Sequence, residues 1–85
     1  MKLGDRQRAL LDEAISLLDR HGADARDPLL RRALGAIDEL RDALRRQDPH
    51  GSAALVERLQ SARLDLNLGD PEGALEALTS LRDDA

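Results

Sequence analysis

The sequence predicts an all-α protein, and three observations carry that prediction. Its apolar residues are almost all Leu and Ala, with no Phe, Tyr, Trp or Cys in the chain. They recur at intervals of three and four residues, which is the spacing of one face of a helix. Asp-Pro pairs at 27–28, 48–49 and 70–71 mark helix starts, because the Asp carboxylate can accept a backbone N–H of the first turn. We expect one domain over residues 1–85, either an antiparallel four-helix bundle or two stacked helical hairpins.

The first two expected helices cover about residues 5–21 and 28–47. Gly22 ends the first, since glycine readily adopts the left-handed conformation of many helix ends. The second helix has the widest apolar arc of the four, and a helix of that kind usually touches two neighbours. Gly35 lies on its polar side, either as a tolerated residue or because another backbone approaches closely there. The inward residues are Leu10, Leu11, Ala14, Ile15, Leu17 and Leu18 on the first helix and Leu29, Leu30, Ala33, Leu34, Ala36, Ile37, Leu40, Ala43 and Leu44 on the second.

The third expected helix covers about residues 52–68 and carries two separate apolar strips. It could begin at Pro49, or after Ser52 if that residue is its N-cap. Leu64 and Leu68 project well away from its main strip, so one partner helix cannot cover both strips. We expect the fourth helix, about residues 71–82, to cover the second strip. The main strip is Leu55, Leu59, Ala62 and Leu66, and the inward face of the fourth helix is Ala74, Leu75, Ala77, Leu78 and Leu81.

The segment LNLGDPEGALEAL, residues 66–78, joins these last two helices. With Ala62 before it, and with Gly69, Asp70, Ala74 and Leu78 within it, residues 62–78 resemble the helical hairpin of a tetratricopeptide repeat. The resemblance implies a helical hairpin that stacks on others to bind protein partners. The bulky positions of the first helix of such a repeat are occupied here by Arg58, Ser61 and Asp65, which departs from the family pattern. A well-capped helical hairpin outside that family is the other interpretation of the same residues.

Composition and charge argue against several classes of function. The net charge of −4 is carried by residues 70–85, and no segment offers the basic face on which nucleic-acid binding relies. Two His and no Cys do not make a metal-ligand cluster. No phosphate-binding loop or nucleophile motif occurs, so we expect no enzyme, no catalytic residue and no cofactor. No apolar run is long enough for a signal peptide or a membrane span, and we expect a cytoplasmic protein without membrane contact.

These patterns favour a protein–protein interaction module. A small core of Leu and Ala is weakly specified, and small domains often gain stability by association. We expect a homodimer formed by surplus apolar surface on the second and third helices, with a groove for a helix of another protein as a further possibility. The alternative is a regulatory or scaffold subunit that acts by binding another protein: antitoxin-like, anti-sigma-like or a small repeat-type adaptor. The candidate interface residues are Leu64, Leu68, Leu29, Leu40 and Gly35.

Overall fold

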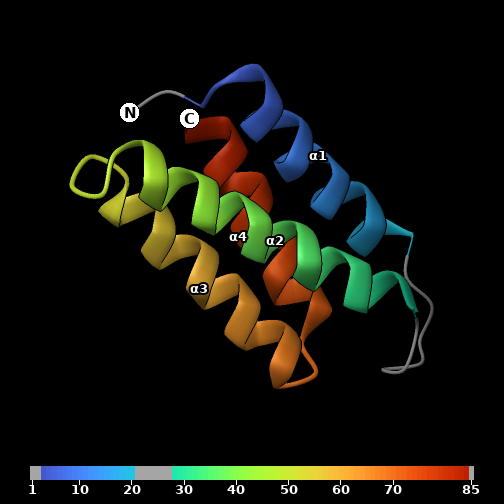
Figure 1. The fold of residues 1–85 in the computed structure, drawn as a ribbon. Helices are drawn as coiled ribbons and strands as arrows, with labels where there is room; N and C mark the ends of the chain where they lie inside the picture. The colour runs from blue at the N-terminus through green and yellow to red at the C-terminus, as the bar shows by residue number, and fades with distance from the viewer. Residues whose placement is uncertain (1–2, 21–27, 85) are drawn as a thin grey trace.

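Four helices account for most of the chain in a computed structural model that describes residues 3–20 and 28–84 (Figure 1). In chain order they are α1 (Asp5–Asp19), α2 (Pro28–Gln47), α3 (Ala53–Asn67) and α4 (Pro71–Asp84). No strand occurs in these two ranges. The predicted all-α class is therefore confirmed. The expected roles of Gly22 and of the Asp27-Pro28 cap lie outside the described residues.

The helices close into one bundle in which each helix packs against two others. α1 contacts α2 and α4, and α3 contacts the same two helices from the other side. Consecutive helices run antiparallel, so α1 begins and α4 ends at the same end of the bundle (Figure 1). The radius of gyration is 11.9 Å, as for a compact domain of this length, about 12 Å. The expected architecture was a four-helix bundle or two stacked helical hairpins, and the contacts of α1 with α4 and of α2 with α3 join the two hairpins into one bundle.

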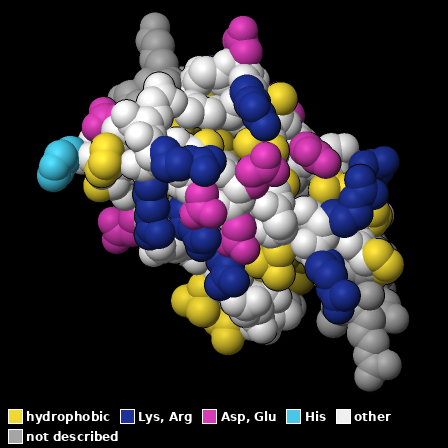
Figure 2. Space-filling view, viewed as in Figure 1, with side chains coloured by type: hydrophobic (Ala, Val, Ile, Leu, Met, Phe, Trp, Pro, Cys, Tyr) yellow, Lys and Arg dark blue, Asp and Glu magenta, His cyan; other side chains and the backbone are white. Residues whose placement is uncertain are grey.

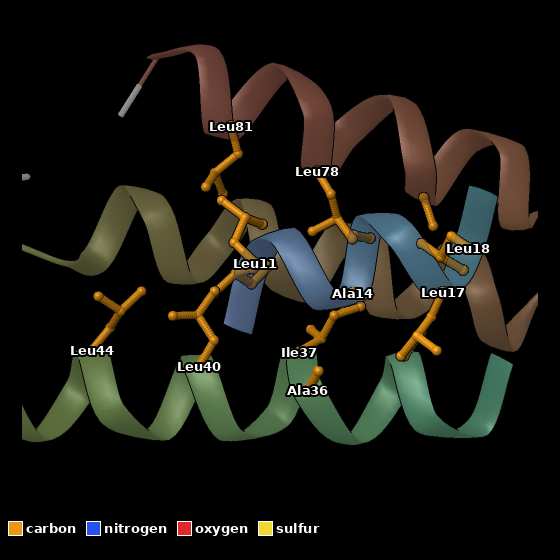
Figure 3. Close-up of a cluster of buried hydrophobic side chains, with 14 of the residues drawn as sticks. Leu11, Ala14, Leu17, Leu18, Ala36, Ile37, Leu40, Leu44, Leu78 and Leu81 are labelled. Carbon is orange, nitrogen blue, oxygen red and sulfur yellow. The ribbon is translucent and has the colours of Figure 1, made fainter. Parts of the chain in front are cut away.

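One apolar core runs through the bundle. Side chains of α1 are directed toward both α2 and α4, and Leu11 lies between Leu40 and Leu81 (Figure 3). Each helix supplies buried residues at three- and four-residue spacing, as its sequence pattern predicts. Two polar residues, Gln7 and Ser52, are buried with them. The apolar members of the core are Leu3, Leu11, Ala14, Leu17, Leu18, Ala33, Ala36, Ile37, Leu40, Leu44, Val56, Leu59, Ala62, Ala74, Leu78 and Leu81.

The connection from α3 to α4 is tight because two local motifs overlap in it. Gly69 has a φ of 80°, and the N–H of Asp70 bonds the carbonyl of Asp65 at 2.8 Å, which is the Schellman ending of a helix. The Asp70 carboxylate then accepts the N–H of Gly73 at 3.0 Å, so it caps α4 as predicted. A Cβ on Gly73 would collide with that carboxylate. Leu68, Gly69 and Asp70, the three residues between the two helices, therefore all belong to helix caps.

The connection from α2 to α3 repeats the same Asp-Pro-X-Gly sequence with a different outcome. The Asp48 carboxylate accepts the N–H of Gly51 at 2.9 Å, yet a turn follows and α3 begins only at Ala53. Of the two expected starts, the later one matches the structure. Ser52 does not cap the helix through its side chain, because its backbone is already in the helical region and its buried hydroxyl has no partner. The interpretation of Ser52 as a side-chain cap is wrong.

Candidate interaction surface

The candidates on α2 do not form a common apolar surface. Leu40 is 1% exposed and lies in the core, and Leu29 is half-buried and packs against that core. Gly35 is exposed, and a Cβ built on it would meet nothing within 4 Å. The structure therefore places no other backbone of the described chain close to Gly35. The wide apolar arc of α2 is used inside the bundle, and Leu40 has to be removed from the candidate interface.

The candidates on α3 lie together on the surface. Leu64 is 56% exposed and Leu68, at the C-cap of the helix, is 73% exposed. They are the exposed large apolar side chains among the described residues. The expectation that α4 would cover them is wrong, because α4 packs against the opposite strip of α3, where Leu59 and Ala62 are buried. The second strip of α3 is left without a partner inside the described chain.

The outer face of α3 carries almost no charge. We use this name for Leu68 and the exposed residues of the helix, among which Glu57 is the one charged side chain. Figure 2 shows hydrophobic side chains at the lower end of the view, where Figure 1 places the C-terminal end of α3. Charged residues are depleted from the centres of protein interfaces, and this face shares that one feature with them. The outer face consists of Ala53, Ala54, Glu57, Gln60, Ser61, Leu64, Asn67 and Leu68.

The outer surfaces of the other helices are highly charged by comparison. Charged side chains of both signs interleave over the middle of the face in Figure 2. Such mixed charge is typical of a surface that stays in contact with water. The exposed charged residues are Asp5, Arg6, Arg8, Asp12, Glu13 and Asp19 on α1, Arg31, Arg32, Glu39, Asp42, Arg45 and Arg46 on α2, and Glu72, Glu76, Asp83 and Asp84 on α4.

The two arginines of α3 are used at its contacts with neighbouring helices. An ion pair crosses each of the four main helix–helix contacts of the bundle. The pairs are Arg6–Glu39 at 3.9 Å, Asp38–Arg63 at 2.9 Å, Arg58–Asp84 at 3.0 Å and Arg82–Asp12 at 3.6 Å. Each contributes at most about 1 kcal/mol because the side chains are partly exposed. The two pairs that α3 makes hold Arg58 and Arg63 beside its outer face and not on it.

A groove between the start of α1 and the end of α2 is the second candidate. It has a volume of about 390 Å³. Its deepest polar group is the amide of Gln7, whose Oε1 accepts the N–H of Gly4 at 2.9 Å and whose Nε2 donates to Gln47. Gln7 was not among the predicted inward residues, although its spacing of four from Leu11 places it on the inward face. The charged lining is balanced and its buried amide is satisfied, so the groove offers less evidence for binding. The charged lining residues are Asp5, Arg6, Glu39 and Arg46.

The described residues show no group of three or more His, Asp or Glu side chains that could hold a metal ion. Within the same ranges, no helix has the length and apolar character needed to cross a membrane. Of the residues that resemble a tetratricopeptide repeat, Ala62, Ala74 and Leu78 are fully buried between packed helices. Comparison with protein-family models, curated proteins and solved structures finds no match for this chain. The outer face of α3 is therefore the basis for a proposed function.

Proposed function

We propose that this protein is a non-enzymatic interaction module that forms a homodimer through the outer face of α3. The observation that carries the proposal is the exposure of Leu64 and Leu68 on a face with a single charge. Covering apolar surface contributes about 25 cal/mol per Å², and the neighbouring helices of the same chain do not cover this face. The apolar pattern of the sequence predicts an interface on two helices, and the two exposed leucines support an interface on α3 alone. The cytoplasmic location stays a prediction.

The test is to place charge on this face. The double variant Leu64→Glu, Leu68→Glu puts two carboxylates where the partner surface would exclude water, which disfavours association strongly. We expect the wild-type mass to rise from monomer to dimer with concentration, and the variant to remain monomeric with unchanged helical circular dichroism. Sedimentation with interference optics is the suitable measurement, because a chain without Trp or Tyr hardly absorbs at 280 nm.

The matched control is Ala9→Glu, Ser16→Glu, which adds the same charge to two exposed positions of α1. It should associate like the wild type. Association of the Leu64→Glu, Leu68→Glu variant at wild-type strength would remove the outer face of α3 from the interface.

The alternative function, a regulatory or scaffold subunit, uses the same surface for a different protein. The repeat-type adaptor suggested by residues 62–78 belongs to this alternative. A wild-type chain that remains monomeric at every concentration would favour it, since the exposed leucines would then be free for a helix of another protein. Thermal melting further distinguishes this alternative from the homodimeric module. A sharp cooperative melt of the isolated chain would argue against a subunit that folds only on its partner.

A further inference from the structure

The outer face of α3 has the spacing of a coiled-coil seam. Ala54, Glu57, Ser61, Leu64 and Leu68 follow one another at alternating intervals of three and four residues, and all five are exposed. That alternation places residues in one line when two helices pack along each other at a shallow angle. The seam therefore fits a straight helix of similar length, lying alongside α3.

The seam is small at one end and bulky at the other. Ala54 lies near the start of α3, Ser61 in its middle, and Leu64 and Leu68 at its end. Two parallel copies would oppose leucine to leucine and Ala54 to Ala54, leaving a gap at the small end, and would bring the two Glu57 carboxylates together. Two antiparallel copies place Leu68 of one against Ala54 of the other, which is the fit of a large side chain into a small site. Side-chain size therefore favours the antiparallel orientation.

The charges beside the seam select the same orientation. Arg58 and Asp65 both lie on one edge of the seam, seven residues apart. In an antiparallel pair centred on Ser61, Arg58 of each copy lies beside Asp65 of the other on the same edge, because the two are three and four residues from the centre. Glu57 is also four residues from the centre and comes near the same Asp65, but it lies on the seam and not on this edge. Within the described chain Arg58 bonds Asp84 and Ser80, whereas the Asp65 carboxylate has no cationic partner. The opposite edge carries Ala53, Gln60 and Asn67, which add no repulsion.

From these complementarities we infer that a second copy of this chain occupies the face, with the two α3 helices antiparallel and the twofold axis passing beside Ser61. The inference rests on the proposed self-association and adds its geometry. A helix of 15 residues is about 22 Å long, so the contact is at the small end of specific interfaces. The dimer should accordingly dissociate on dilution.

Single-cysteine cross-linking tests this geometry cleanly, because the chain has no Cys of its own. Under mild oxidation, Ser61→Cys should form a disulfide-linked dimer, since the two copies of this position meet at the axis. Ala54→Cys alone should not, because its two copies lie about 20 Å apart in the antiparallel pair. Mixing Ala54→Cys with Leu68→Cys should give the linked heterodimer. Ser16→Cys, exposed on α1, is the control for random collisions.

A parallel pair would reverse this pattern: Ala54→Cys would link to itself, and the mixture would not give the heterodimer. That result would overturn the antiparallel geometry and leave the proposed dimer standing. Failure of Ser61→Cys to link, in a sample that sedimentation shows to be dimeric, would do the same. A monomeric wild type would overturn both proposals together.

A charge reversal provides a second measurement without a cysteine. Asp65→Arg in a Glu57→Gln background places an arginine opposite Arg58 of the other copy, twice per dimer, with no carboxylate beside it, and should weaken dimerisation about fivefold relative to Glu57→Gln alone. Because Asp65 pairs with no cation inside the described chain, the variant should fold normally. Unchanged affinity would contradict the predicted position of Asp65 at the contact.

Discussion

The outer surface of α2 is charged, whereas that of α3 carries exposed leucines. α2 has the wider apolar arc, yet its outer surface is charged, and all its large apolar side chains except the partly buried Leu34 lie in or against the core. α3 has fewer apolar residues, divided into two strips, and one strip remains exposed at Leu64 and Leu68. A continuous arc can face two neighbours at once, whereas a strip on the opposite side of a helix can face only a partner outside the bundle.

The core side of α2 should give the largest effect. Leu40→Ala removes a side chain that is 1% exposed, and it should lower the free energy of unfolding by about 3 kcal/mol. Leu64→Ala, the same change on the outer face of α3, should alter it by less than about 0.5 kcal/mol. Urea unfolding followed by circular dichroism, at a concentration where the protein is monomeric, measures both. Similar losses for the two variants would contradict the assignment of Leu64 to a free surface.

Adding a methyl group on the outer side of α2 should stabilise the protein. Gly35→Ala meets no atom within 4 Å and should raise the free energy of unfolding by about 0.5–1 kcal/mol, since alanine loses less entropy in a helix. Association should stay unchanged. Thermal melting and sedimentation measure the two effects.

A larger side chain turns this prediction into a direct comparison of the two surfaces. Gly35→Arg and Ser61→Arg introduce the same group on the outer sides of α2 and α3, both exposed. We expect Ser61→Arg to abolish dimerisation and Gly35→Arg to leave it intact. The reverse result would move the interface to α2.

Sequence patterns predicted the helices well because the signals at their ends are local. Asp70 caps α4, and Gly69 ends α3, through atoms within five residues of each other. The start of α3 was harder to predict. Asp48-Pro49-His50-Gly51 contains the same cap as the start of α4, yet the regular helix begins later, with Ser52 buried between the two. The complete burial of Ser52 is a property of tertiary packing, which no local pattern contains.

Only part of the candidate surface was predicted, namely the part that depends on one helix. Periodicity placed Leu64 and Leu68 on their own strip of α3, which is a property of a single helix. Whether α4 would cover that strip depends on how the helices are rotated against each other, and the periodicity of a single helix does not contain this rotation. Gln7 was not predicted for a different reason: its spacing from Leu11 indicates an inward position, but a polar side chain does not count in an apolar pattern.

The smallest effect concerns the ion pair that joins the two helices compared above. Asp38 of α2 contacts Arg63 of α3 at 2.9 Å and Arg41 of its own helix at 3.2 Å, and it is partly exposed. Asp38→Asn should lower the free energy of unfolding by less than about 1 kcal/mol. The difference from wild type should shrink in about 1 M salt, where charges are screened within about 3 Å.

Asp42→Asn is the control, since Asp42 contacts Arg41 within α2 and joins no second helix. Equal losses in the two variants would mean that the contact between α2 and α3 gains nothing from the Asp38–Arg63 pair, and that apolar packing alone joins them.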